Sequence, residues 1–494
     1  MYFTQAFDRL ELGRYGFLAM GLCTQCKGVR QVNYRKLVRN TATAFLAQGI
    51  AMALSIVQTL LIPRLLGVEQ YGYWQLFIFY ASYVGFFHLG LNDGVYLIKG
   101  GQDRTTINKR SVNSQFLISV SFQFLIAVLI CVIAITGGFN DGREFVLVCT
   151  GVFLVIQNAA SFLSFLLQAM NETRRSSYST IVERLSFLVP LTVLLMTRTN
   201  SFRPYVISYI FSSVVQLCFC LWLCRDFIFS GLDDLPMALR ESALSVRIGI
   251  KLMLANIASQ LILGIARAAI DAAWGITTFG RLSFALSMVN FFLAFVSQAS
   301  MVLFPALRQS KLSEIRRFYQ YARDVMGLFF PIIYLLYFPM VWLLGLWLPE
   351  YSDSLVFFAF LLPICIFDSK MNITCTTFFK VRRQEGLLLL INVVTSVASA
   401  IGTCIGIYVV GSIYFVICAV VICIVGRSLW SERYIGRSLE VPTNKISLGE
   451  LVVTLVFVVV ALNLPLSVAC VSYCFAYTVF LLFFRDEIRM IGVK

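Results

Sequence analysis

Long apolar segments recur along almost the whole chain, and this feature constrains the fold more than any other. A helix crosses the hydrocarbon core of a membrane with about 20 apolar residues. About fourteen segments of this kind follow one another, and they lie near residues 41–63, 72–98, 112–136, 145–169, 181–197, 205–224, 248–273, 281–306, 325–348, 355–379, 387–409, 412–426, 446–463 and 465–484. The sequence therefore predicts an all-α polytopic membrane protein with about 14 transmembrane helices.

The composition excludes other classes of protein. Of the 494 residues, 59% are hydrophobic and 13% are charged. Soluble proteins are about 45–50% apolar and about 25% charged, so a soluble or disordered chain is excluded. Most of the 14 Cys lie in apolar runs, where Cys acts as a small hydrophobic residue. Cys23 and Cys26 form an isolated C-x-x-C pair, which does not predict a zinc or redox site.

Basic residues are distributed unevenly among the connections. The chain has 40 Lys and Arg against 25 Asp and Glu, a net charge of +15. If the N-terminus is cytoplasmic, most basic residues fall in inside connections, and the outside connections contain Arg64, Arg143, Arg198 and Arg203. Basic loops mark the cytoplasmic side of membrane proteins. We therefore expect both termini to be cytoplasmic, and a nucleic-acid partner is not needed to explain the charge.

A short motif occurs twice. Gly67–Gly72 reads GVEQYG and joins the first two segments, and Gly275–Gly280 reads GITTFG and joins the seventh and eighth. The same offset relates Asn40, where the first segment begins, to Ile248, where the seventh begins. The pattern predicts two parallel six-helix lobes, although a common tight interfacial turn is the alternative explanation.

The predicted organisation follows from this repeat. It consists of a cytoplasmic basic lead at 1–39 (with Met20 as an alternative start), an N-terminal six-helix lobe at 40–224, a cytoplasmic linker at 225–247, a C-terminal six-helix lobe at 248–426, a second cytoplasmic linker at 427–445, an extra helix pair at 446–484 and a cytoplasmic tail at 485–494.

Polar side chains form stripes on the segments that flank the two turns. In the seventh segment, five residues from Asn256 to Asp271 fall within an arc of about 80°. A polar side chain at membrane depth is costly when it faces lipid, so it tends to face a cavity or a partner. We therefore expect a hydrated cavity between the lobes. Its candidate lining residues are Arg267, Asn256, Gln260, Gln48, Ser55, Asn290, Lys370 and Lys251, of which Lys251 could instead extend to the interface.

Charged residues inside the segments suggest further roles. Arg267 and Asp271 are four residues apart and can pair. One possibility is that they form a neutral pair that holds the helices together. The other is that Arg267 contacts an anionic substrate, while Asp271 modulates the charge of Arg267 or accepts a proton. Asp271, Asp93 and Asp368 are the candidates for H+ or Na+ coupling. His88 is expected on the helix face away from Asp93, as a hydrogen-bonded helix contact.

The motifs of the common enzyme classes do not occur. The single His excludes a His-rich metal site, and the sequence has no P-loop, Gly-rich dinucleotide motif or nucleophile elbow in a workable context. The outside connections are short, whereas a membrane polymerase needs a large outside loop with acidic, Arg or His groups. We therefore expect a transporter without a metal or cofactor, other than a coupling ion.

Several short motifs together resemble a known family. They are the stretch PRLLGVEQYG at Pro63–Gly72, Leu89-Gly90-Leu91, and Leu303-Phe304-Pro305 after the second turn. With this topology, the chain is similar to the polysaccharide transporters of the multidrug/oligosaccharidyl-lipid/polysaccharide (MOP) exporter superfamily. Among these it resembles the Wzx-type O-antigen flippases.

The resemblance implies an alternating-access flippase in the bacterial cytoplasmic (inner) membrane. The implied substrate is undecaprenyl pyrophosphate that carries one oligosaccharide repeat unit of O-antigen lipopolysaccharide or another surface polysaccharide. It would move from the cytoplasmic to the periplasmic leaflet, attracted by Arg267, Lys251 and Lys370. The pair at 446–484 would form a groove for the lipid tail, as in the related lipid II flippases. Polymerase and chain-length regulator proteins are the expected partners.

Two other functions stay open. A cation-coupled multidrug or metabolite exporter of the same superfamily would favour an acidic, aromatic cavity, and the basic residues argue against it. A polytopic polysaccharide polymerase is the less favoured alternative, because few outside groups are available for catalysis.

Overall fold

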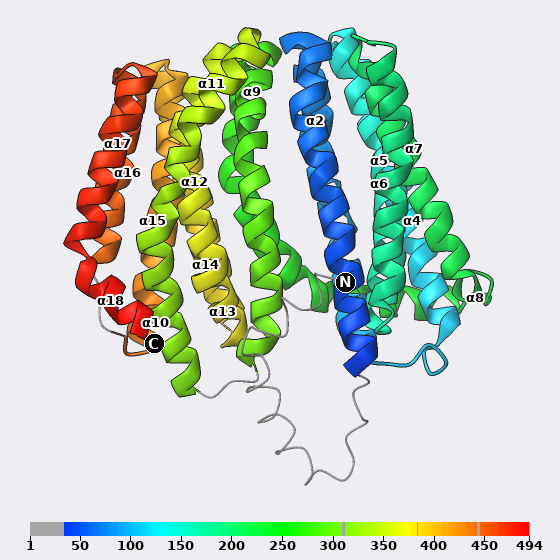
Figure 1. Cartoon of the computed structure of the whole chain (residues 1–494). Coiled ribbons are helices and arrows are strands. Elements are labelled where there is room, and N and C mark those ends of the chain that lie inside the picture. The colour runs from blue at the N-terminus through cyan, green and yellow to red at the C-terminus, as the bar shows by residue number, and fades with distance from the viewer. Residues whose placement is uncertain (1–33, 309–311, 383, 442–444, 494) are drawn as a thin grey trace, which may run out of the picture.

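The computed structural model is a bundle of long helices, and it describes residues 34–493 except 309–311, 383 and 442–444. No strand occurs among these residues. Eleven helical segments in the described part are long and apolar enough to cross a membrane. The N-terminal half of the chain occupies one side of the bundle and the C-terminal half the other (Figure 1). The expected all-α polytopic fold is confirmed.

The first half of the bundle contains the helices that precede residue 230. They are α2 (Tyr34–Tyr83), the 3-10 helix η1 (Val84–His88), α3 (Leu91–Lys99), α4 (Lys109–Thr136), α5 (Asp141–Ala169), α6 (Thr173–Met196), α7 (Phe202–Leu223) and the short α8 (Arg225–Ile228).

The second half begins with the longest helix. Its elements are α9 (Leu235–Arg308), α10 (Leu312–Phe329), the 3-10 helix η2 (Phe330–Leu336), α11 (Tyr337–Trp347), the 3-10 turn η3 (Pro349–Tyr351), α12 (Ser352–Lys370), the π-helix η4 (Met371–Thr376), α13 (Thr377–Val381), α14 (Glu385–Ile405), the π-helix η5 (Gly406–Val410), α15 (Ile413–Ser438), α16 (Ile446–Asn463), α17 (Leu466–Phe483) and α18 (Arg485–Val493). The expected boundary between the segments 387–409 and 412–426 is confirmed, because Gly411 adopts a left-handed conformation (φ 68°) between η5 and α15.

Helices α2 and α9 each contain two of the predicted segments, joined at a glycine kink. Gly67 has φ 66° and ψ 174°, and Gly275 has φ 80° and ψ 178°. This backbone region is accessible essentially only to glycine. The first glycine of each copy of the motif is therefore required by the kink.

The second glycines of the two motifs bring the two halves into contact. A Cβ atom on Gly72 would lie 2.5 Å from the carbonyl oxygen of Ile276, and one on Gly280 would lie 2.9 Å from that of Val68. The offset that relates Gly72 to Gly280 also relates Val68 to Ile276. The two contacts therefore occupy equivalent positions in the two copies of the motif.

The connections gather at two ends of the bundle. One end has the connections that follow α3, α5, α8, α13 and α15, and we call it the basic end because these carry most of the basic loop residues. The other, which we call the distal end, has the two glycine kinks and the connections after α4, α6, η5 and α16. In Figure 1 the basic end is at the bottom, where α2 begins and α18 lies.

Two expected linkers are largely helical. Helix α9 begins at Leu235 rather than near 248, with Pro236 in its first turn, a position that tolerates proline. Helix α15 continues through the expected linker to Ser438. Arg427 and Glu432 did not end this helix because each is buried against a charged partner from another helix.

The pair α16–α17 attaches to the second half through tyrosine hydroxyl groups and stacked rings. The hydroxyl groups of Tyr473 and Tyr477 donate to the carbonyl oxygens of Pro331 (2.8 Å) and Leu328 (3.0 Å). The ring of Tyr334 stacks on Phe457 with centroids 4.3 Å apart. These carbonyl groups lie in or beside η2, where the irregular helix leaves acceptors for the hydroxyl groups.

Candidate functional site between the two lobes

Arg267 lies on α9 where the second half of the bundle meets α2. Its guanidinium carbon is 4.8 Å from the ring centroid of Phe79 on α2 and 5.3 Å from that of Phe279 on α9. One nitrogen, Nη2, donates to Ser283 Oγ (3.0 Å), and Nε is buried without a hydrogen-bond partner. No carboxylate lies within ion-pair distance of Arg267 in the described part of the chain. The residue therefore keeps an unbalanced positive charge at the interface.

Asp271 pairs with Arg143, so the proposed Arg267–Asp271 pair is wrong. Arg143 Nη1 and Nη2 each donate to one oxygen of Asp271, both at 2.6 Å. A guanidinium that binds both carboxylate oxygens makes a stronger contact than a single charge on the same helix. Arg143 was expected in an outside connection, but it lies in the first turn of α5. The pair therefore joins the two lobes at the distal end.

Further contacts close the distal end between α2 and the segment 347–351. The guanidinium of Arg64 lies 3.7 Å from the ring centroid of Trp347. Trp347 Nε1 donates to the carbonyl oxygen of Leu60 (3.1 Å), and the Tyr351 hydroxyl donates to that of Pro63 (3.3 Å). Both lobes contribute to each of these contacts, so the distal end is closed in this conformation.

At the basic end, α3 packs closely against the first part of α9. A Cβ atom on Gly94 would lie 1.9 Å from the carbonyl oxygen of Ser245, and one on Gly249 would lie 2.0 Å from that of Gly90. The Ser245 hydroxyl also donates to Gln115 on α4 (2.8 Å). The two lobes are therefore in direct backbone contact along α3 and α9.

The three carboxylates expected to couple to an ion each face a basic group. Asp271 pairs with Arg143, and Asp368 pairs with Arg427. Asp93 Oδ2 lies 3.8 Å from Nε2 of His88. The expectation that His88 lies on the face away from Asp93 is therefore wrong, because η1 and the turn at Gly90 interrupt the helix between them. His88 does form a hydrogen bond, since its Nδ1 accepts the backbone N–H of Gly90 (3.0 Å).

The structure separates the expected cavity residues into different groups. Lys370 is buried between Glu432 and Glu450, away from Arg267. The other candidates on α9 with a described side chain (Lys251, Asn256, Gln260 and Asn290) are exposed. The side chains of Gln48 and Ser55 lie outside the described residues.

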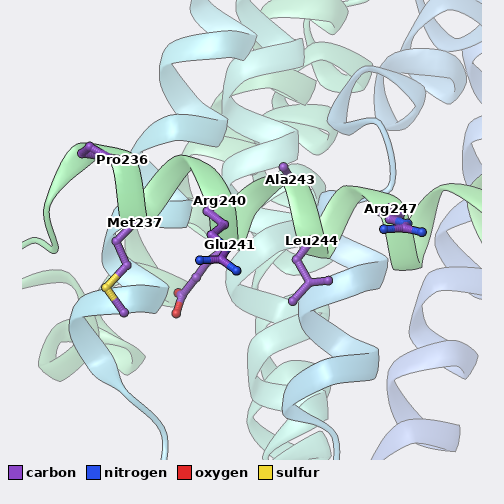
Figure 2. A pocket seen from close by; sticks show the side chains of 7 residues that line it. All are labelled: Pro236, Met237, Arg240, Glu241, Ala243, Leu244 and Arg247. Carbon is purple, nitrogen blue, oxygen red and sulfur yellow. The ribbon is translucent and has the colours of Figure 1, made fainter.

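A pocket of about 860 Å³ opens beside the first part of α9, at the basic end (Figure 2). Met237, Arg240 and Leu244 extend to the same side of this helix in Figure 2. The full set of described lining residues is Pro236, Met237, Arg240, Glu241, Ala243, Leu244 and Arg247. An exposed helix face that combines apolar side chains with arginines suits the interface of a membrane with anionic headgroups.

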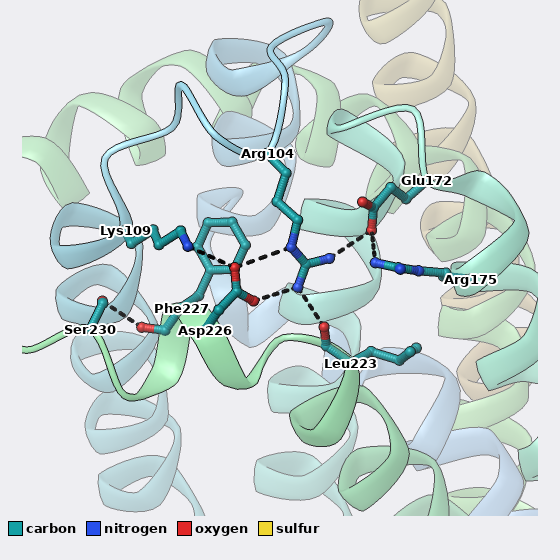
Figure 3. A network of polar contacts seen from close by, with 8 residues as sticks. All are labelled: Arg104, Lys109, Glu172, Arg175, Leu223, Asp226, Phe227 and Ser230. Carbon is teal, nitrogen blue, oxygen red and sulfur yellow. Dashed lines mark hydrogen bonds and ion pairs between the residues drawn. The ribbon is translucent and has the colours of Figure 1, made fainter.

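Arg104 lies at the centre of a network of polar contacts at the basic end of the first lobe (Figure 3). It donates to Glu172 (2.8 Å), to the carbonyl oxygen of Leu223 (2.6 Å) and to Asp226, which also pairs with Lys109 (3.0 Å). Burial opposes ionisation of Asp226, but the hydrogen bonds from Arg104 and Lys109 outweigh it and lower its pKa to about 2. The network ties the loop after α3 to the ends of α5 and α7.

The contacts of four residues were not predicted from the sequence, namely Arg143, Trp347, Glu432 and Glu450. Glu450 had a detectable signal, since it is a single carboxylate within the apolar run 446–463. Glu432 was assigned to a linker. For Arg143 and Trp347 the partners are distant in the sequence, so no local pattern could have identified them.

The comparisons with known proteins agree with this architecture. The family model described as "Polysaccharide biosynthesis protein" matches residues 37–311, more than half of the chain. A search of curated proteins gives no significant match.

Three solved structures show the same fold. An inward-facing multidrug resistance MATE family transporter of the MOP superfamily superposes with a TM-score of 0.60 at 12% identity, over 82% of this chain and 100% of that one. The lipid II flippase MurJ in an inward closed conformation gives 0.57 at 11% identity, over 91% and 100%. A MATE structure in the straight conformation gives 0.53 at 12% identity, over 82% and 96%. The chain belongs to the polysaccharide biosynthesis protein family and has the fold of the MOP-superfamily transporters.

Proposed function

We propose that the protein is a flippase for undecaprenyl-pyrophosphate-linked oligosaccharide repeat units. In this proposal the units move from the cytoplasmic to the periplasmic leaflet of a bacterial inner membrane. The observation that carries the proposal is the unbalanced charge of Arg267 at the lobe interface. The polysaccharide biosynthesis family and the fold shared with a lipid II flippase support it further.

The chemistry of the substrate explains why such a site is needed. Each polar group of a pyrophosphate and its sugars loses water on entering hydrocarbon, which costs several kcal/mol per group. A buried guanidinium at the lobe interface would provide a charged hydrogen-bond donor for the pyrophosphate. The prenyl chain is apolar and can remain in the lipid beside the protein.

The closed distal end suggests how access alternates. With Arg143–Asp271 and Arg64–Trp347 in place, the distal end is blocked, and the substrate would arrive from the basic end once the contact between α3 and α9 separates. We assign the basic end to the cytoplasm from its charge. Arg240 and Arg247 at the pocket of α9 would meet the anionic headgroup first. Separation of the two distal contacts would then expose Arg267 to the opposite side.

Asp93 is our candidate for H+ or Na+ coupling. Asp271 and Asp368 are each neutralised by an arginine, whereas the basic group found near Asp93 is His88, at 3.8 Å. A carboxylate without a permanent cationic partner can gain or lose a proton, or bind Na+, with less rearrangement. We keep polymerase and chain-length regulator proteins as the partners expected from the family.

A second function is compatible with the same fold. The MATE family transporter superposes about as well as the flippase, with TM-scores of 0.60 and 0.57. A cation-coupled exporter of small molecules is therefore the alternative. The unbalanced Arg267 argues against it, because a cationic substrate would be repelled there.

Deletion of the gene in its own host separates the two functions. The measurement is the leaflet in which the lipid-linked repeat unit accumulates, together with the amount of surface polysaccharide. We expect accumulation in the cytoplasmic leaflet and loss of surface polysaccharide. Normal surface polysaccharide with altered drug or metabolite efflux would instead support the exporter, and periplasmic accumulation of unpolymerised units would point to a polymerase.

A further inference from the structure

Three charged side chains meet where α12, α15 and α16 pack together. Lys370 Nζ lies 2.6 Å from Glu450 Oε2 and 2.8 Å from Glu432 Oε2. The exposed fractions of these side chains are 1% for Lys370, 0% for Glu450 and 9% for Glu432. The site therefore holds two carboxyl groups and one ammonium group away from water.

The neighbouring arginines do not supply the missing positive charge. Arg427 pairs with Asp368, and Arg323 of α10 pairs with Asp324 (2.9 Å). The charge of Arg323 also acts on Glu432. Three cationic groups thus face four carboxyl groups, which leaves one negative charge in excess when all are ionised.

The other neighbours of the cluster that the structure describes are neutral. Ser447 of α16 donates its hydroxyl to Glu432 Oε1, and Tyr319 donates to the backbone carbonyl of Glu432 (2.8 Å). The Tyr334 hydroxyl of η2 donates to Thr454 (3.0 Å), and Cys375 of η4 lies in the same region. The excess negative charge is therefore neutralised at one of the carboxyl groups beside Lys370.

Glu450 is the group at which this occurs. Its Oε1 atom is buried and has no hydrogen-bond partner, and Lys370 is the one donor found for its side chain among the described residues. Glu432 Oε2 also lacks a hydrogen bond, but Glu432 accepts one from Ser447 at Oε1, lies 2.8 Å from Lys370 Nζ and is 9% exposed, whereas Glu450 is fully buried. A buried carboxylate without compensating partners is far more costly than a neutral carboxyl group. A metal cation is disfavoured because an ammonium group already contacts Oε2. In addition, the described residues contain no group of three His, Cys, Asp or Glu that could hold a metal.

We propose that the Lys370–Glu432–Glu450 cluster is a binding site for a single proton, which is held on Glu450. Loss of the proton leaves an unbalanced charge between α16 and the second lobe. The attachment of the helix pair α16–α17 is therefore sensitive to pH. This site is independent of which substrate the protein carries.

Infrared spectroscopy of the purified full-length protein tests the proton directly. At neutral pH, we expect a protonated-carboxyl C=O band that is present in the wild type and absent in Glu450→Gln. The Glu314→Gln variant, which changes a carboxylate outside the cluster, is the control and should keep the band. A wild-type spectrum without this band, or a band that persists in Glu450→Gln, would overturn the proposal.

Thermal stability in detergent provides a second test, because the variants change the number of ionisable carboxyl groups around Lys370. Glu450→Gln replaces a neutral group by a neutral group and removes the proton uptake that accompanies folding above about pH 4.3, so its apparent Tm should be no lower than that of the wild type. Glu432→Gln forces Glu450 to release its proton and pair with Lys370, so a lower Tm is expected. The double Gln variant leaves Lys370 without a carboxylate and should be the least stable. A Glu450→Gln variant that does not fold, or is as unstable as the double variant, would contradict the assignment.

The pH dependence has a definite sign. A free glutamate loses its proton near pH 4.3, so above this pH the folded protein binds one proton more than the unfolded chain. Stability must then fall as pH rises above about 4.3. We expect this fall to be larger in the wild type than in Glu450→Gln, and equal slopes in the two proteins would refute a proton on Glu450.

Discussion

Asp271 on α9 accepts two hydrogen bonds of 2.6 Å from Arg143 on α5, and this ion pair joins the two lobes at the distal end. Asp271 is nearly buried, with 6% of its side chain exposed, and Arg143 is 25% exposed. The pair is therefore partly shielded from water and restrains the opening of that end. It also leaves Arg267, one turn earlier on α9, free for another anion.

Arg143→Gln should favour opening of the distal end. Removal of one partner leaves a buried carboxylate unpaired, and we expect a shift of about 1–3 kcal/mol toward the open state, since Arg143 is partly exposed. Labelling of a cysteine introduced at Gln260 by a membrane-impermeant thiol reagent from the periplasmic side measures this opening.

The matched control for this variant is Arg203→Gln. Arg203 pairs with Asp141 at the same end, but both side chains are exposed and both belong to the first lobe. Labelling should therefore stay at the wild-type rate. Equal labelling of all three proteins would show that Arg143 does not restrain the distal end.

Trp347→Leu should weaken the same closure to a smaller extent. The substitution removes the ring under Arg64 and the indole N–H that donates to Leu60. A cation–π contact contributes about 0.5–2 kcal/mol. We expect the cysteine at position 260 to be labelled faster in Trp347→Leu than in the otherwise wild-type protein, but more slowly than in Arg143→Gln. Faster labelling in Trp347→Leu than in Arg143→Gln would show that the Arg64–Trp347 contact, and not the Arg143–Asp271 pair, contributes more to closure of the distal end.

Gly72→Ala and Gly280→Ala should destabilise the protein by similar amounts. In each case the new Cβ would lie under 3.0 Å from a backbone oxygen of the other repeat. Overpacking of this kind costs about 1–3 kcal/mol. The control is Gly345→Ala on α11, where nothing lies within 4 Å of the added Cβ. Apparent Tm in detergent measures the effect, and a control as unstable as the two variants would exclude this explanation.

The Arg104 network should lose its contribution at low pH. Because the pKa of Asp226 is lowered to about 2, its ion pairs stabilise the fold above about pH 4 and are lost as the pH falls toward 2. Arg104→Ala should therefore lower Tm at pH 7, and the difference from the wild type should shrink below pH 4. A difference that is constant from pH 7 to pH 3 would show that Arg104 acts through packing alone.

The sequence predicted the helical fold well because membrane helices leave a local signal. A run of about 20 apolar residues is nearly sufficient to place each one. The motif at Gly67–Gly72 and Gly275–Gly280 also has a local cause, since each kink needs a glycine backbone. Helices α9 and α15 extend beyond the segment boundaries expected near 248 and 426, because they continue into charged sequence.

The partners of the charged residues were harder to predict. A spacing of four suggested Arg267–Asp271, but Arg143 approaches Asp271 from a helix far away in the sequence. Lys370 was expected in the cavity, and it is instead enclosed by carboxyl groups from α15 and α16. Such pairings depend on tertiary packing, which leaves no periodic signal in one sequence.

Export by Arg267 variants tests the central claim most directly. In a strain that lacks the chromosomal gene, Arg267→Gln, Arg267→Lys and the wild type are expressed to equal membrane levels. The leaflet distribution of the lipid-linked repeat unit is then measured. We expect the unit to remain in the cytoplasmic leaflet with Arg267→Gln, and partial transfer with Arg267→Lys, which keeps the charge but not the guanidinium geometry. Wild-type transfer by Arg267→Gln would contradict the claim that this charge binds the substrate.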